Sequence, residues 1–404
     1  MRLTALTGSR GNRAGDMRIL YSHRIQSRDG QSVHLDELVG ALRDAGHEVR
    51  IVGPKFYAGA GLGAESRLTA FLRRLLPGML AELAELGYNL VAWQSLERAA
   101  AEFRPDVIYE RYNLYYLAGA WLARRRGILF YVEVNAPLAD ERSLYGGLRL
   151  SGLAHRTERF VWRAADRVFA VTGDLKQRVV LAGVPEVRVS VIPNGVVPER
   201  FPLRNVEPGA EGRGKSVVLG FIGFVRAWHH LESVIRGMAG MTPNVSLVVA
   251  GDGPARRDLE GIAEALGCAG RVRFTGLVAR QDVPETLAGF DIALQPHALA
   301  YASPLKLFEY MAAGLAIVAP DQPNIREVVV TEETALLFDP EHDGAMWQAI
   351  VRLVSDPALR IRLGRAAREA VHRQEFTWHG NAKRIASFAE IDLLDRRGSL
   401  RGRD

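Results

Sequence analysis

The sequence predicts an α/β protein made of two doubly wound, Rossmann-like domains, each built on a parallel sheet. Short apolar runs alternate along the chain with longer segments in which apolar residues recur at helical spacing, a pattern typical of parallel sheets covered by helices on both faces. A length of 404 residues is enough for two such domains. The alternation stops once, over residues 196–216, and then restarts.

The first domain is predicted over residues 17–195, after a flexible, Gly- and Arg-rich leader at 1–16. Met17 opens the first strand-like run and is a candidate start codon. A helix follows, because the apolar residues of 35–42 fall on one face, and Gly46 ends it. The predicted strands of this domain are Ile19–Tyr21, Val49–Val52, Val107–Tyr109, Ile128–Val134, Val168–Val171 and Val189–Ile192.

Residues 196–216 are rich in Pro, Gly and charge, which favours a linker. The second domain is predicted over 217–376, and a C-terminal helix over 377–404 is expected to return towards the first domain. Its strands are expected at Val217–Gly223, Ser246–Ala250, Val272–Phe274, Ile292–Gln295, Leu315–Val318 and Ala335–Phe338, with closing helices at Ala345–Ser355, Ala358–His372 and about Asn381–Leu394. Two such domains facing each other are expected to form a cleft, with ligands beyond the carboxyl ends of the strands.

Composition excludes several classes of protein. Forty-eight per cent hydrophobic and 24% charged residues are ordinary for a soluble protein, and no apolar run reaches the roughly 18 residues of a membrane span. Cys268 is the only cysteine, so no intrachain disulfide can form and a cytoplasmic setting is expected. The ten His show no HExxH-type spacing. We therefore expect neither a metal nor another cofactor.

The net charge of +6 is uneven, since residues 1–205 hold 29 Lys and Arg against 21 Asp and Glu. A basic first half can attract an anionic partner: nucleic acid, phospholipid headgroups or a phosphorylated acceptor. Composition bias is the alternative, because 47 of the 52 basic residues are Arg. Basic motifs interleaved with aromatic residues are missing, so nucleic acid is not an expected partner.

Three loops of the second half carry residue types suited to an anionic ligand. The loop after the first strand holds Arg226 and His229, and a helix starting near His229 would direct its free N–H groups at an anion such as a diphosphate. Gly251 and Gly253 follow the second strand and allow close backbone approach to a ligand. An ordinary βα loop with surface Arg and His is the alternative for the first of these loops.

The segment 301–314 predicts a helix that begins near Pro304 and ends at Gly314. Glu309 borders its apolar face and needs partners, which ribose hydroxyls would supply. Lys306 lies in the first helical turn, where the helix dipole disfavours a cation and a nearby phosphate would offset that cost. A solvated lysine is the alternative interpretation of Lys306.

In the first domain, Gly30 lies between a strand and a helix and permits close backbone approach, so we take it as a donor-binding residue, while Ser32 is suited to cap the helix. Glu133 and Asn135 lie at the end of another strand. Polar side chains at that place are either active-site groups or loop caps, and we take Glu133 and Asn135 as the candidate catalytic residues.

These segments together resemble a known family. The C-terminal half is similar to the retaining glycosyltransferases of family four, which have the GT-B fold. The matching segments follow the family order and span about residues 17–390: Gly30–His34, Gly46–Val49, Pro105–Ile108, Ile192–Gly195, Gly223 with His229, Val249–Pro254, Phe274–Gly276, Asp291–Pro296, Ser303–Gly314 and Thr377–Trp378.

The resemblance implies transfer of a sugar from a nucleotide-sugar to a saccharide, lipid-linked or small-molecule acceptor, with retention and without metal. Glu309 matches the second glutamate of the family's E-x7-E pair, which contacts ribose, and His229 matches a lysine that binds diphosphate. The family arginine aligns with Phe224 in this sequence, so we assign its role to Arg226, two positions later. The backbone of Ser303, Pro304 and Leu305 is expected to face the donor.

Three positions depart from the family pattern. Tyr301 takes the place of the first glutamate, Asn135 that of a histidine, and His229 must be protonated to replace a lysine. A bound diphosphate would favour that protonation. A non-catalytic nucleotide-sugar-binding relative and an epimerase on the same scaffold are the alternative functions.

Two basic and apolar stretches of the first domain, Leu68–Leu86 and Leu148–Phe169, suit contact with an anionic membrane. A peripheral location at the inner face of the membrane is therefore an expectation as well. Packing of these helices against the sheet is the alternative.

Overall fold

A computed structural model describes residues 16–25, 30–54, 78–202, 216–240 and 244–401. Its contacts divide the chain into two compact units. Unit 1 holds the described residues up to Phe169, with Val179–Ser190 and the chain from Ala382 on. Unit 2 holds Ala170–Arg178 and Val191–Asn381.

Unit 1 is built on a six-stranded sheet in the order β2-β1-β3-β4-β5-β6. The registered pairs of this sheet are parallel. The strand bounds are β1 Arg18–Ser22, β2 Glu48–Val52, β3 Val107–Arg111, β4 Leu129–Val134, β5 Arg167–Ala170 and β6 Val189–Val191. Because β1 lies between β2 and β3, the connections that leave these strands diverge there, which is where ligands bind in doubly wound sheets.

The helices of the first half are α1 Gly30–Asp44, α3 Gly78–Phe103, α4 Ala118–Arg126, α5 Leu138–Tyr145, α6 Ser151–Ala164 and α7 Gly173–Leu181. Strand β4 shows how both faces of the sheet are covered. A Cβ on Gly119 of α4 would lie 3.2 Å from the ring of Phe130. The next residue, Tyr131, points to the other face and donates a hydrogen bond to Asp392 of α15 (Trp378–Arg401) at 2.6 Å.

Unit 2 is built on a second six-stranded sheet, in the order β12-β11-β10-β7-β8-β9, again with parallel registered pairs. Its strands are β7 Val217–Ile222, β8 Val245–Ala250, β9 Val272–Gly276, β10 Ile292–Leu294, β11 Ala316–Pro320 and β12 Leu336–Phe338. Its helices are α8 Leu231–Ala239, α9 Arg256–Ala265, α10 Val283–Ala288, α11 Leu305–Ala312, α12 Pro323–Arg326, α13 Ala345–Ser355 and α14 Pro357–Arg373.

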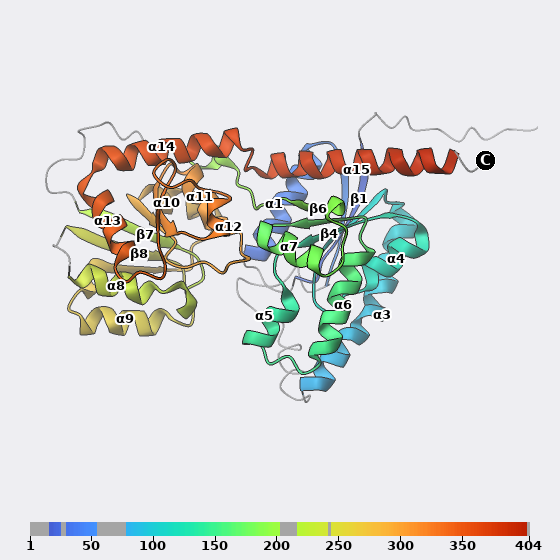
Figure 1. Ribbon diagram of the computed structural model, residues 1–404, viewed down its shortest axis with the longest axis horizontal. Helices are drawn as coiled ribbons and strands as arrows, with labels where there is room; N and C mark the ends of the chain where they lie inside the picture. The colour runs from blue at the N-terminus through green and yellow to red at the C-terminus, as the bar shows by residue number, and fades with distance from the viewer. Residues whose placement is uncertain (1–15, 26–29, 55–77, 203–215, 241–243, 402–404) are drawn as a thin grey trace, which may run out of the picture. The chain divides into compact units, whose positions relative to one another are not determined.

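Two apolar cores lie on the two faces of this second sheet. Leu247 and Val249 of β8 face the core formed with α8, α9 and α13, whereas Val248 faces the core formed with α10, α11 and α14. Figure 1 shows α8 and α9 on one face of the sheet and α11 and α14 on the other. Both faces are buried, so these strands are near-continuous apolar runs.

The structure confirms the predicted fold class of two Rossmann-like parallel-sheet domains. All twelve predicted strands are present, with ends that differ by one or two residues. The three predicted closing helices correspond to α13, α14 and α15. The leader at 1–16 and the apolar stretch at 68–77 fall almost wholly outside the described residues.

The division by contacts differs from the predicted domain boundaries in two places. Residues 170–178 and 191–195, assigned from sequence to the first domain, belong to unit 2. Val196, the predicted start of the linker, is fully buried, and its N–H donates to the carbonyl of Phe376. Residues 203–215 of that linker lie outside the described residues. The predicted domains were continuous stretches of chain, so they could not assign a short segment to the other unit. Sequence periodicity does not show which of the two sheets such a segment joins.

No helix in the described part of the chain is long and apolar enough to cross a membrane.

Candidate functional site

Helix α11 carries three of the predicted donor residues, Leu305, Lys306 and Glu309, and Tyr310 fixes it at the point where the connections of the second sheet diverge. The buried Tyr310 hydroxyl accepts a hydrogen bond from the N–H of Ile222 at 3.1 Å and lies 3.3 Å from the carbonyl of Leu294. Ile222 ends β7 and Leu294 ends β10, two neighbouring strands. The Tyr310 side chain therefore ties α11 to the carboxyl edge of the sheet, where ligands of such folds bind.

The loops after β7 and β8 pack backbone to backbone. The N–H of Val225 donates to the carbonyl of Asp252 at 2.9 Å. A Cβ on Gly251 would lie 1.9 Å from the carbonyl oxygen of Gly223, and one on Gly253 would lie 2.2 Å from that of Val225. We expected the missing side chains of these two glycines to let a ligand approach the backbone. In the structure, the backbone of the loop after β7 occupies that space.

This contact gives a stability prediction. Gly251→Ala places a Cβ against a carbonyl oxygen at φ +146°, a conformation that alanine avoids, so we expect the free energy of unfolding to fall by at least about 2 kcal/mol. The matched control is Gly261→Ala in α9, where a Cβ meets nothing within 4 Å. There we expect a gain of roughly 0.5–1 kcal/mol from helix propensity. Urea unfolding measures both, and equal effects would contradict the assigned contact.

Lys306 places a cation beside the loop after β7. Its Nζ lies 3.8 Å from the centroid of the Phe221 ring, and a Cβ on Gly223 would lie 3.1 Å from the same atom. Burial lowers the pKa of Lys306 to about 7, although the nearby Glu309 acts to raise it. No ion pair to Lys306 is found among the described residues. A partly buried ammonium group with no counter-ion is suited to a phosphate.

His229 is held as a neutral ring. It is buried, with the ring of Trp228 3.9 Å and that of Phe221 4.9 Å from its own, centroid to centroid. Its Nδ1 accepts the N–H of Arg226 at 3.3 Å, so the neutral ring carries its proton on Nε2. Burial, together with the charges of Lys306 and Arg226, lowers the pKa of His229 to about 2. The expected cationic His229 is thus not found without a ligand: the ring is a neutral donor, and Lys306 is the nearby cation.

Arg226 lies exposed at the start of the short 3₁₀ turn Ala227–His229, and its guanidinium carbon lies 4.9 Å from the ring centroid of Phe224. Helix α8 begins at Leu231, two residues later than expected. The ring of Phe224 therefore supports the guanidinium group of Arg226.

Glu309 is buried in α11 and forms an ion pair with Arg280, which precedes α10. Sequence reasoning missed Arg280, because nothing in its surroundings marks it as a partner of a residue 29 positions away. The pair supplies the buried carboxylate with the counter-charge that it needs. It also fixes the position of Glu309, one helical turn after Lys306.

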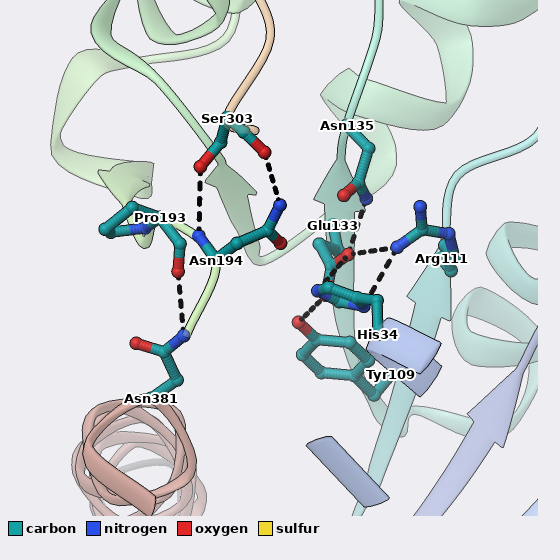
Figure 2. A network of polar contacts seen from close by, with 9 residues as sticks. All are labelled: His34, Tyr109, Arg111, Glu133, Asn135, Pro193, Asn194, Ser303 and Asn381. Atoms are coloured by element: carbon teal, nitrogen blue, oxygen red, sulfur yellow. Dashed lines mark hydrogen bonds and ion pairs between the residues drawn. The ribbon is translucent and has the colours of Figure 1, made fainter. Parts of the chain in front are cut away.

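The segment before α11 is held by asparagine side chains. The backbone N–H of Asn194 donates to the Ser303 hydroxyl at 3.2 Å, and its side-chain amide donates to the Ser303 carbonyl at 2.6 Å (Figure 2). Asn324, buried in α12, donates to the carbonyls of Leu299 and Ala302 at 3.0 and 2.8 Å. Pro304 and Leu305 follow directly as the cap and first residue of α11. These bonds fix the backbone that we expect to face the donor.

In unit 1, Glu133 lies at the centre of a buried polar network at the ends of β3 and β4. Its carboxylate accepts hydrogen bonds from the Tyr109 hydroxyl at 2.6 Å, from Arg111 at 2.9 Å and from the Asn135 amide (Figure 2). The Nε2 of His34 lies 3.2 Å from the same carboxylate. Glu133 and Asn135, predicted together, are thus direct neighbours.

Burial and the hydrogen bonds of this network set the protonation states of His34 and Glu133. Burial lowers the pKa of His34 to about 4, so this ring is neutral; it accepts from Arg111 through Nδ1 at 2.9 Å and donates through Nε2 to Glu133. Burial acts to raise the pKa of Glu133, but the facing His34 and Arg111, with the hydrogen bonds of Asn135 and Tyr109, outweigh it and lower the pKa. Glu133 is therefore an ionised carboxylate with its lone pairs engaged, which favours holding its neighbours over attacking a substrate.

Sequence reasoning named Glu133 and Asn135 but missed Arg111, although the polar end of the strand carried a signal for it. Gly30 is exposed as the first residue of α1, and Ser32, the expected cap, is instead buried in the first turn. Among the described residues no group of three or more His, Cys, Asp or Glu side chains is placed to hold a metal ion. Independence from metal stays a prediction.

Comparison with known proteins identifies the family. Residues 29–195 match the glycosyl transferase 4-like domain, and residues 205–370 match the glycosyl transferases group 1 domain. Relatives include the 2-deoxystreptamine glucosyltransferase of Streptomyces kanamyceticus, 25% identical over 68% of this chain and 74% of that one. A GDP-mannose-dependent alpha-mannosyltransferase of Mycobacterium tuberculosis is 25% identical over 85% of this chain and 88% of its own.

Solved structures share the fold over nearly the whole chain. The Anabaena HepE structure in complex with UDP has a TM-score of 0.71 at 19% identity, over 92% of this chain and 99% of that one. Sucrose-phosphate synthase from Thermosynechococcus elongatus has the same TM-score at 17% identity, over 94% and 100%. The two matched domains and the two doubly wound sheets define a GT-B glycosyltransferase. The chain belongs to the group 1 glycosyltransferases.

Proposed function

We propose that the protein transfers a sugar from a nucleotide-sugar donor to a hydroxyl acceptor with retention at the anomeric carbon and without metal. One observation carries the proposal: Lys306 and Glu309, one turn apart on α11, combine a cation that forms no ion pair among the described residues with a fixed buried carboxylate. Such a pair is complementary to the diphosphate and the ribose of one nucleotide. The UDP bound to the HepE structure supports a donor of this class.

In this proposal each group of unit 2 has one task. Lys306, Arg226 and the Nε2–H of His229 bind the diphosphate, and the N–H groups at the start of α11 add the positive end of its dipole. Glu309 accepts hydrogen bonds from the ribose hydroxyls. Because side chains and backbone balance the diphosphate charge, no metal is required.

The transfer breaks the bond between the anomeric carbon and the diphosphate oxygen and forms one to the acceptor oxygen on the same face. The leaving phosphate oxygen takes the acceptor proton, so the protein mainly positions substrates and stabilises developing charge. Unit 1 is proposed to supply the acceptor side: Asn135 contacts substrate, and Glu133 holds Asn135 and Arg111 in place. The anomeric configuration of the product, read by NMR coupling constants, tests retention.

Glu309→Ala is expected to weaken binding of a nucleoside monophosphate and of the matching diphosphate by the same factor, roughly 10-fold or more. The lost interaction is a hydrogen bond to a charged group, worth about 1.5–3 kcal/mol, and it involves the ribose that both ligands share. Calorimetric titration of both ligands measures the factor.

The matched control is Glu285→Ala, which removes an exposed carboxylate of α10. It should leave both affinities unchanged. Unchanged affinities in Glu309→Ala, or a loss confined to the diphosphate, would refute the ribose role.

The acceptor is proposed to be a saccharide, a lipid-linked saccharide or a small molecule with hydroxyl groups. Relatives named as a glycogen synthase and as 2-deoxystreptamine and phosphatidyl-myo-inositol transferases span these classes. Peripheral membrane contact stays a prediction. Helix α6 packs one face onto unit 1 through buried residues such as Val161 and Trp162, whereas α3 leaves Leu83, Leu90 and Val91 exposed. Sedimentation with anionic vesicles tests this contact.

A nucleotide-sugar-binding relative without turnover is the second candidate, because Tyr301 stands where the family has a glutamate. The Tyr301 carbonyl accepts a hydrogen bond from the Thr172 hydroxyl at 3.0 Å, so the residue is anchored in unit 2. Incubation with the bound donor and a panel of acceptors separates the two functions. Release of the nucleoside diphosphate favours the enzyme, and binding with no release under any condition favours the second candidate.

A further inference from the structure

A groove of about 910 Å³ lies in unit 1, away from the residues assigned to sugar transfer. It is formed by α4, α6, the turn before β4 and the last part of α15. Its position is at the amino end of β4, since Gly127, Ile128 and Phe130 line it, whereas Asn135 follows the carboxyl end of the same strand. At roughly 3.3 Å per residue, about 16 Å of strand separates Phe130 from Asn135.

The lining of the groove is strongly basic. Five arginines contribute to it, against a single acidic residue, Asp166: these are Arg124, Arg156, Arg159, Arg163 and Arg396. Asp166 is already neutralised, because its carboxylate accepts two hydrogen bonds from Arg396 at 2.8 Å and one from the N–H of Phe130 at 2.8 Å. Four guanidinium charges are therefore left without a carboxylate among the described residues that line the groove.

The arginines of α6 lie on one face of the helix. Arg156, Arg159 and Arg163 are spaced i, i+3 and i+7, and the opposite face packs inward. Arg163 donates to the carbonyl of Ala182 at 2.6 Å, which fixes the side chain without cancelling its charge. Within the part of the chain that the structure describes, neither Arg156 nor Arg159 forms an ion pair. Like charges at this spacing destabilise a helix, so an anion bound between them would stabilise it.

We propose that this groove binds a ligand with at least two phosphate groups. Guanidinium groups bind phosphate oxygens in pairs, and arginines from three helices present such pairs along one concave surface. A volume of about 910 Å³ is that of a small-molecule site. Ala120, Ala123 and the half-exposed Phe160 supply apolar surface beneath the charges, which suits a ring or alkyl group attached to the phosphates.

This inference goes beyond the proposed sugar transfer. The ligand can be a soluble polyphosphorylated molecule or the headgroup of a phosphorylated lipid, and the chemistry recognised is the same. Because Arg396 belongs to α15 and the other groups to α4 and α6, an occupied groove holds the end of α15 against these helices within unit 1.

The test is calorimetric titration with inorganic tripolyphosphate, in a Lys306→Met background so that the donor site does not contribute. We expect binding that weakens at least tenfold in Arg156→Gln/Arg159→Gln. The matched control, Arg98→Gln/Arg188→Gln, removes the same charge from exposed residues outside the groove and should bind as the parent does. Both double variants replace exposed side chains, so each is expected to fold.

A second arm uses phosphatidylcholine vesicles with and without a phosphorylated inositol lipid. Binding to the phosphorylated vesicles that depends on Arg156 and Arg159 identifies a headgroup as the source, and tripolyphosphate binding alone identifies a soluble ligand. Absence of binding in both arms, or an equal loss in the two double variants, would overturn the proposal. Nucleoside diphosphate binding is measured separately, by comparing the wild type with Lys306→Met. The groove proposal and the donor-site proposal can therefore each be contradicted independently of the other.

Discussion

Lys306→Met is expected to lose nucleoside diphosphate binding by at least about 100-fold while the protein stays as stable as the wild type or becomes more stable. The substitution keeps an unbranched chain over Phe221 and removes a partly buried cation that has no ion pair among the described residues. A residue needed only for the fold would show the opposite pattern. Titration calorimetry and urea unfolding on the same preparation give both numbers.

The same substitution has a pH signature. The pKa of Lys306 in the folded chain is about 7, below its ordinary 10.5, because of burial. Between these two pH values the unfolded state binds more protons, so this residue makes stability increase as the pH rises from about 7 to 10.5. Below pH 7 the full cost of burying the cation applies. The difference in unfolding free energy between wild type and Lys306→Met should therefore shrink across that window.

Diphosphate binding should in turn raise the pKa of Lys306, because an adjacent anion favours the charged form. Affinity is then expected to fall as pH rises above 7, with net proton uptake near pH 8. Titrations in buffers of different ionisation enthalpy measure that uptake. Equal uptake in wild type and Lys306→Met would mean that another group takes the proton.

Glu133→Gln is expected to lower the free energy of unfolding by about 3–5 kcal/mol, the usual cost of leaving one partner of a buried ion pair without its counter-charge. The partner is Arg111, which lies 2.9 Å from the Glu133 carboxylate in the interior of unit 1. Arg111→Met should cost a similar amount for the same reason. The double substitution should cost clearly less than the two single ones together, because it removes both charges.

Activity separates the positioning role of Glu133 from a purely structural one. At a temperature where Glu133→Gln stays folded, we expect kcat to fall roughly 100-fold, as displaced groups lose their geometry. The affinity for the nucleoside diphosphate should not change, because the proposed donor contacts belong to unit 2. A kcat unchanged within twofold would contradict the positioning role, as would strictly additive unfolding energies in the double variant.

The sequence was sufficient to predict the strands because each of them is buried on both faces and therefore appears as an apolar run between helical patterns. The loops at the carboxyl ends of the second sheet were likewise predictable, because glycines and polar residues at strand ends mark them; their role in donor binding stays a prediction. Glu133 and Asn135 were found in this way, and the structure places them in contact.

The contacts that the sequence did not predict join residues that lie far apart along the chain. Arg280 meets Glu309 over 29 positions, and Asn194 meets Ser303 over 109, distances at which no local pattern connects two residues. The lowered pKa of His229 in the ligand-free chain could not be predicted either, because it depends on burial and on neighbours that only the folded chain brings together. Its protonation beside a bound diphosphate stays a prediction. Gly251 was named from the sequence because it has no Cβ, and a Cβ at this position would indeed clash. The group that it would meet is the backbone of the loop after β7.

The central claim is that unit 2 binds a nucleotide-sugar through Lys306 and Glu309 without metal. The most direct test is titration calorimetry of the purified chain with UDP, GDP, ADP and dTDP in the presence of EDTA, repeated with Lys306→Met. We expect at least one of the four to bind the wild type at micromolar concentration and Lys306→Met to lose this binding. Binding that requires a divalent cation, binding that is equal in the variant, or no binding of any of the four would contradict the central claim.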